Sequence, residues 1–86
     1  MNRKVIVVEN DSIVYQNEQV SPLIVNLTKG FEILGRNIWK EQVSYLNFGE
    51  FVVSLKRIKT KLFIVIDDKK ADFNSVLEEN NGELLK

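Results

Sequence analysis

The sequence predicts an α+β fold: a five-stranded antiparallel sheet of strand order 2-1-5-4-3, with helices on both faces. One observation is the order of apolar runs along the 86 residues, which is strand, strand, helix, strand, strand, strand, helix. The other is that Val5–Val8 and Leu62–Ile66 are apolar without interruption, which indicates that both faces of these strands are covered. The first and fifth strands therefore take the inner places. We expect a single domain over residues 1–86.

Polar turns separate the strands from one another. The expected strands are Lys4–Glu9, Ser12–Asn17, Glu41–Phe48, Phe51–Arg57 and Lys61–Ile66. Asn10 and Asp11 lie between the first two, and both residue types tolerate the left-handed backbone of a two-residue hairpin turn. Gly49 and Glu50 take the same place in the second hairpin. The third strand falls at a sheet edge.

Two segments have the periodicity of amphipathic helices. The first begins at Ser21, a favourable N-cap, with Pro22 at the first helical position, and runs to about Trp39. Its main apolar stripe, which we expect to face the sheet, is Val20, Ile24, Leu27, Phe31, Leu34 and Ile38, and Leu23 widens it. The closing helix is expected over Ala71–Leu85, with Asp72 near its start. Its stripe is Phe73, Val76, Leu77 and Leu84.

Composition argues against several classes of function. The 12 basic and 12 acidic residues leave no net charge, whereas a nucleic-acid-binding protein usually has a basic excess. The chain has neither cysteine nor histidine, and so it lacks thiolate ligands and the commonest general base. No apolar run approaches the roughly 20 residues of a transmembrane helix, and the N-terminus does not resemble a signal peptide. We therefore expect a cytoplasmic, non-catalytic protein without a cofactor.

Positive charge is concentrated around one predicted turn, at Lys56, Arg57, Lys59 and Lys61. Lysines at a sheet edge commonly prevent unwanted strand pairing. The same group is also a candidate contact for an acidic partner. A nucleic-acid site built on Lys56–Lys61 is an alternative function, although aromatic side chains for base stacking are not interleaved with these charges.

Acidic side chains follow the last strand, at Asp67 and Asp68, and Asp72 is close by in sequence. Carboxylate oxygens are suitable ligands for magnesium or calcium. The spacing matches no calcium-binding loop, and acidic residues before a helix are common because they complement its dipole. The sequence does not decide whether this cluster binds a cation.

Five apolar residues are candidates for an interface. Val25, Ile33 and Trp39 fall off the main stripe of the first helix, on the side expected to face water, and Val43 and Tyr45 follow in the next strand. We expect a two-fold homodimer in which the first helices pack antiparallel and the Glu41–Phe48 strands lie side by side. If the chain forms this dimer, Ile33→Glu yields a monomer.

The element order resembles the roadblock/longin superfamily of profilin-like domains, in a minimal version that is expected to lack the extra terminal helices of either branch. The similarity is one of pattern and covers nearly the whole chain. Its parts are the hairpin Val5–Val8 and Ile13–Tyr15, the helix Ser21–Trp39, the hairpin Val43–Leu46 and Gly49–Val53, the strand Lys61–Asp68 and the helix start Ala71–Phe73.

The resemblance implies a non-catalytic platform that dimerises through its central helix and neighbouring strand. It also implies a partner that is a small GTPase or a component of a trafficking or motility assembly. A PAS-like small-molecule sensor is a further alternative, although such sensors normally place several helices between the second and third strands, where this chain has one.

Overall fold

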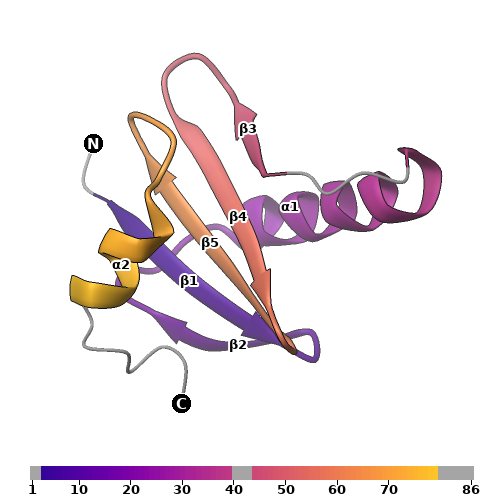
Figure 1. Ribbon diagram of the computed structural model, residues 1–86, viewed down its shortest axis with the longest axis horizontal. Coiled ribbons are helices and arrows are strands. Elements are labelled where there is room, and N and C mark those ends of the chain that lie inside the picture. Colours follow the sequence, from indigo (N-terminus) through magenta and orange to yellow (C-terminus); the bar gives the residue numbers. More distant parts are fainter. Residues whose placement is uncertain (1–2, 40–43, 80–86) are drawn as a thin grey trace.

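The structure is a computed structural model that describes residues 3–39 and 44–79 (Figure 1). It contains one antiparallel sheet of order β2-β1-β5-β4-β3 and helices on both of its faces, as the sequence predicted. The elements are β1 (Lys4–Glu9), β2 (Ser12–Gln16), α1 (Pro22–Leu34), the π-helical segment η1 (Gly35–Trp39), β3 (Tyr45–Asn47), β4 (Val52–Ile58), β5 (Lys61–Asp67) and α2 (Phe73–Glu79).

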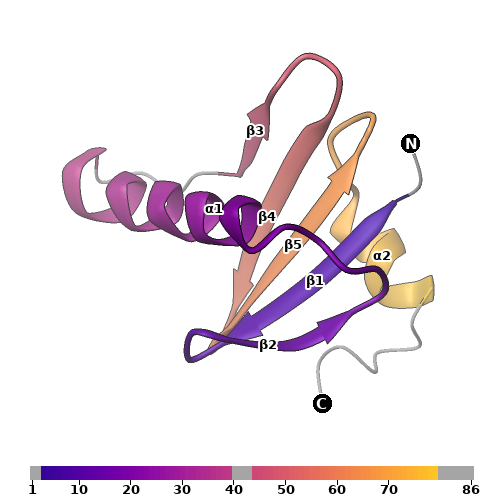
Figure 2. The same ribbon diagram turned by 180° about the vertical axis from the view of Figure 1, so that it is seen from behind.

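The sheet separates two hydrophobic layers, because successive side chains of a strand point to opposite faces. On the α1 side, Ile6, Ile64 and Val53 belong to a core that the start of α1 covers. On the α2 side, Phe63 and Val65 pack with Val76 of α2. Figures 1 and 2 show the two helices on opposite faces of the sheet. Four consecutive residues of β1 and five of β5 are buried, as predicted for the inner strands.

Strand β4 is also an inner strand, and it is more deeply buried than its polar residues suggested. Val52, Val53, Ser54 and Leu55 are all buried. The hydroxyl of Ser54 accepts a hydrogen bond of 2.9 Å from the backbone N–H of Ala71. A buried hydroxyl is tolerated there because it has a partner.

The chain reverses direction in tight turns that require unusual backbone angles. Asn10 and Asp11 have φ of 50° and 65°, which confirms the left-handed turn predicted between β1 and β2. Gly49 has φ of 89° and its N–H donates to Asn47 Oδ1 at 2.8 Å, at the predicted β3–β4 turn. Lys59, between β4 and β5, has φ of 57°, which is uncommon for a residue with a side chain.

Helix α1 begins as predicted and then differs in orientation. The Ser21 hydroxyl accepts a hydrogen bond from the N–H of Leu23 at 3.3 Å, and Pro22 occupies the first turn. The expected buried stripe, however, does not face the sheet beyond Val20 and Ile24. That part of the prediction was wrong.

The side chains that α1 buries lie one position after the expected stripe. They are Val25, Thr28 and Glu32, and the backbone of Gly35 is buried as well. One position corresponds to a rotation of about 100° around the helix axis. The physical reason is that only the start of α1 lies over the sheet; further along, polar contacts of Glu32 determine which face points inward.

Helix α2 follows the amphipathic rule. The carboxylate of Asp72 accepts a hydrogen bond from the N–H of Asn74 at 3.0 Å, and so it caps the helix. Val76 is fully buried, and Phe73 and Leu77 are half-buried on the same core, as predicted. The predicted continuation to Leu85, with Leu84 in the stripe, lies outside the described residues, as does the predicted start of β3 at Glu41.

Candidate interaction face and charged cleft

An apolar surface runs along one side of α1 and η1, about 100° around the helix axis from the buried side. We call it the α1 apolar face, and it consists of Leu23, Leu27, Phe31, Leu34 and Ile38. Leu23 is 74% exposed, Leu27 46%, Leu34 41% and Ile38 64%, while Phe31 is half-buried. A row of large exposed apolar side chains on one helix is typical of a surface that contacts another protein.

The location of α1 explains why this face has no cover among the described residues. Only Val20, Ile24 and Val25, at the start of the helix, pack in the core on this side of the sheet. The end of α1 and the segment η1 extend past β4 (Figure 2). The spacing of Leu27, Phe31, Leu34 and Ile38 is four, three and four, which is the spacing of the contact positions in paired helices.

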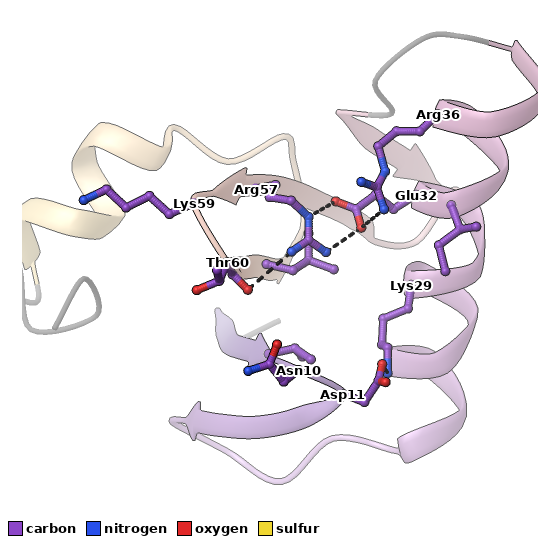
Figure 3. A pocket seen from close by; sticks show the side chains of 11 residues that line it. Asn10, Asp11, Lys29, Glu32, Arg36, Arg57, Lys59 and Thr60 are labelled. Carbon is purple, nitrogen blue, oxygen red and sulfur yellow. Dashed lines mark hydrogen bonds and ion pairs between the residues drawn. The ribbon is translucent and has the colours of Figure 1, made fainter.

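A cleft of about 440 Å³ lies where α1 meets two turns of the sheet, β1–β2 and β4–β5 (Figure 3). We call it the hairpin cleft. Its lining residues are Val8, Asn10, Asp11, Lys29, Glu32, Ile33, Arg36, Arg57, Lys59, Thr60 and Leu62. Four of these side chains are basic and two are acidic. The cleft is therefore positively charged in a chain whose formal net charge is zero.

A buried ion pair forms the inner wall of the hairpin cleft. The Glu32 side chain is only 5% exposed, and it accepts hydrogen bonds from Arg57 Nε at 2.8 Å and Arg57 Nη2 at 2.7 Å. Arg36, on the same helix, approaches Glu32 Oε1 at 3.8 Å. Two parallel hydrogen bonds from one guanidinium fix the orientation of both groups. The hydrogen bond to Glu32 is also the main cause that raises the pKa of Arg57 above its ordinary value.

A second ion pair spans the opening of the cleft. Lys29 Nζ, on α1, lies 2.9 Å from Asp11 Oδ1, on the β1–β2 turn. The Lys29 side chain is 22% exposed, whereas that of Asp11 is 89% exposed. Figure 3 shows Lys29 reaching toward Asp11, while the Lys59 side chain extends away from both ion pairs. Arg57 Nη1 also donates a long hydrogen bond, 3.4 Å, to the backbone carbonyl of Thr60.

The structure separates the five residues predicted for the interface. Val25 is 5% exposed and packs in the core, so the prediction that it faces water was wrong. Ile33 is 47% exposed, as expected, but it lines the hairpin cleft rather than the α1 apolar face. Tyr45 is 45% exposed on the edge strand β3, with Lys70 Nζ 5.0 Å from its ring centroid. The side chain of Trp39 and all of Val43 lie outside the described residues.

The predicted basic group is divided between the two faces of the sheet. Arg57 points to the α1 side, where it binds Glu32. Lys56 and Lys61 are each adjacent in sequence to a residue whose side chain points to the α1 side. Their own side chains therefore point to the α2 side. Lys59 lies in the turn between them. The four side chains are therefore distributed over both faces of the sheet and the turn that joins β4 to β5.

The carboxylates after β5 have separate local roles. Asp67 accepts hydrogen bonds from the N–H of Asp68 at 2.7 Å and from Arg3 Nε at 3.2 Å. The hydrogen bond from the N–H of Asp68 is the main cause that lowers the pKa of Asp67; burial opposes it, and the contact with Arg3 adds a further lowering effect. Asp72 caps α2. Within the described part of the chain, no group of three or more acidic side chains is placed to hold a metal ion.

Sequence reasoning missed Asp11, Lys29, Glu32 and Arg36 as members of one site. The predicted topology contained a signal for it, because β1 and β5 are antiparallel neighbours and the β1–β2 and β4–β5 turns must lie at the same end of the sheet. The contribution of α1 had no such signal. It depends on the rotation of the helix, which the apolar periodicity predicted incorrectly.

Comparison with known proteins returned no matching family model, curated protein or solved structure. In the described part of the chain, the helices are too short or too polar to cross a membrane.

Proposed function

We propose that this chain is a non-catalytic protein-interaction module that forms a homodimer through the α1 apolar face. The observation that carries the proposal is the exposure of Leu23, Leu27, Leu34 and Ile38 along one side of a single helix. The same helix turns Thr28 and Glu32 inward. A helix that buries polar residues and exposes apolar ones has its apolar partner outside the described fold.

A second copy of the chain is the partner that fits this face best. Two identical helices related by a two-fold axis present the same row of side chains to each other, so one row is sufficient for both halves of the contact. Contact positions spaced by four and three residues interlock along a crossing helix. The structure confirms that β3 lies at the edge of the sheet. This strand is therefore a second element, in addition to α1, for such a contact.

The apolar area involved is adequate for a reversible dimer. The four leucine and isoleucine residues remain 41% to 74% exposed in the monomer. Covering that surface stabilises the complex by on the order of 1 kcal/mol per side chain, about 8 kcal/mol over two copies. Association costs about 4–15 kcal/mol in lost translational and rotational freedom. We therefore expect a dimer whose population depends on concentration.

The interface proposed now differs from the one expected from the sequence, since Val25 is in the core and Ile33 is about 100° around the helix from Leu34. This difference supplies a matched pair of variants. Leu34→Glu and Ile33→Glu introduce the same charge at adjacent positions of similar exposure, 41% and 47%.

Sedimentation equilibrium over a range of micromolar concentrations tests the proposal. We expect the unmodified chain and Ile33→Glu to dimerise, and Leu34→Glu to remain monomeric because its charge lies in the apolar contact. A monomeric wild-type chain, or a Leu34→Glu variant that dimerises as well as Ile33→Glu, would show that this face is not the interface.

A small GTPase as a further partner, or a component of a trafficking or motility assembly, is the part of the proposal that rests on the roadblock/longin resemblance alone. Titration of the purified chain with small GTPases of its source organism, in both nucleotide states, tests it. Binding that differs between the nucleotide states would support a regulatory role. Absence of binding in both states would leave the self-association proposal intact.

A further inference from the structure

We propose that the hairpin cleft binds a small dianion that presents phosphate or carboxylate oxygens. This inference is independent of the proposed dimer, because the cleft and the α1 apolar face have no residue in common. The cleft volume of about 440 Å³ falls in the range of roughly 300–1,000 Å³ that is typical of small-molecule sites.

Glu32 pre-organises the cationic wall of the cleft. The buried carboxylate binds Arg57 through two of its donors, and so it holds the guanidinium plane in one orientation. The Arg36 side chain is half exposed. Its Nη2 lies 3.8 Å from Glu32 Oε1, which is too long for a hydrogen bond. Its N–H groups are therefore available to an anion in the cleft. A planar guanidinium suits both phosphate and carboxylate oxygens.

The carboxylate of Asp11 occupies the position where we expect an anionic oxygen of the ligand to bind. This carboxylate contacts Lys29 Nζ at 2.9 Å, but the side chain is 89% exposed and sits on a turn. An ion pair with one fully hydrated partner contributes little to stability. A ligand that brings its own anionic group can consequently replace Asp11 on Lys29, which is held in place along α1 with only 22% of its side chain exposed.

The charge balance then favours a dianion. After Asp11 is displaced, the cleft lining retains Lys29, Arg36 and Arg57 and one buried carboxylate, that of Glu32, which leaves two positive charges unbalanced. Lys59 is not counted, because its side chain extends away from the ion pairs (Figure 3). A partly enclosed cleft with charge of one sign concentrates counter-ions of the opposite sign.

Titration calorimetry at low ionic strength tests this inference, with inorganic phosphate and succinate as separate probes. We expect saturable 1:1 binding of at least one probe, weakened by added salt. Phosphate alone would identify a phosphoryl ligand and succinate alone a dicarboxylate. Asp11→Asn is expected to tighten binding about two- to fivefold, since it removes the competing carboxylate.

Lys29→Gln and Arg36→Gln are expected to weaken binding by about tenfold or more, because each removes a charged donor. The matched control is Lys69→Gln, which removes one exposed positive charge outside the cleft and should leave affinity unchanged. The inference is overturned if neither probe binds saturably. It is also overturned if Lys69→Gln weakens binding as much as Lys29→Gln does, since the attraction would then be a property of overall charge.

Discussion

The two helices of this fold pack against the sheet in opposite ways. Helix α2 places Val76 at the centre of the core and Phe73 and Leu77 at its margin, so its apolar side chains meet the sheet. Helix α1 buries Thr28 and Glu32 and leaves most of its large apolar side chains exposed. Both helices are amphipathic, but within residues 3–39 and 44–79 only α2 packs its apolar side against the sheet.

This difference shows that amphipathicity identifies a contact face without identifying its partner. Helix α2 is short, and its apolar residues Phe73, Val76 and Leu77 all pack on the core of its side of the sheet. Helix α1 is longer than its contact with the sheet, and beyond Val25 its orientation is set by the ion pair of Glu32 with Arg57. The apolar row of α1 therefore has no cover among the described residues, which is the basis of the proposed contact with a second chain.

The largest expected effect contrasts the apolar faces of the two helices directly. Val76→Asp places a charge at a fully buried position, and we expect it to lower the free energy of unfolding by about 4 kcal/mol or more. Leu27→Asp introduces the same charge at a residue that is 46% exposed, and we expect a loss within about 1 kcal/mol for the monomer. Urea unfolding followed by circular dichroism at low protein concentration measures both. Equal losses would show that α1 and α2 are packed alike.

An intermediate effect is expected from the ion pair that orients α1. Arg57→Ala leaves Glu32 buried with only the more distant Arg36 nearby, and we expect a loss of about 2–4 kcal/mol in the free energy of unfolding. Replacing both partners, as Glu32→Leu with Arg57→Met, should recover most of that loss, because no uncompensated charge remains. If the double variant is no more stable than Arg57→Ala, the buried charge is not the cause.

The smallest effect concerns Asp67, which accepts a hydrogen bond from the N–H of Asp68 and forms a partly exposed ion pair with Arg3. The pKa of Asp67 is lowered in the folded chain from its ordinary value of 3.8. The ionised carboxylate therefore stabilises the fold above that value, and the contribution is lost as the pH falls through the lowered pKa. We expect Asp67→Asn to cost about 0.5–1 kcal/mol at neutral pH, because both partners of the pair are partly exposed.

Thermal unfolding of the wild-type chain and Asp67→Asn from pH 7 to pH 2 measures this contribution. The difference in stability should narrow steadily on acidification. A difference that stays constant over this range would mean that the charge of Asp67 does not contribute, and that only the shape of the side chain matters.

Local sequence determined the elements and most of their limits. The uninterrupted apolar runs of β1 and β5 required cover on both faces, and so they predicted the inner strands and, with them, the strand order. Ser21 and Pro22 determined the start of α1 through capping and a fixed φ angle. Asn10, Asp11 and Gly49 marked the turns, because these residue types accept the backbone angles observed there. Each of these features depends on residues that are near one another in sequence.

The tertiary structure alone decided how α1 lies on the sheet. Periodicity correctly predicted that the apolar side chains of α1 form one stripe. Whether that stripe faces the sheet depends on where the helix extends past the sheet, and on which side chains of the helix and the sheet contact each other. Glu32 and Arg57 are 25 positions apart, and their pairing turns a polar side of α1 inward. The hairpin cleft and the α1 apolar face are both consequences of this one rotation. A period of 3.6 residues predicts which side chains share one face of a helix, but it does not predict what that face contacts.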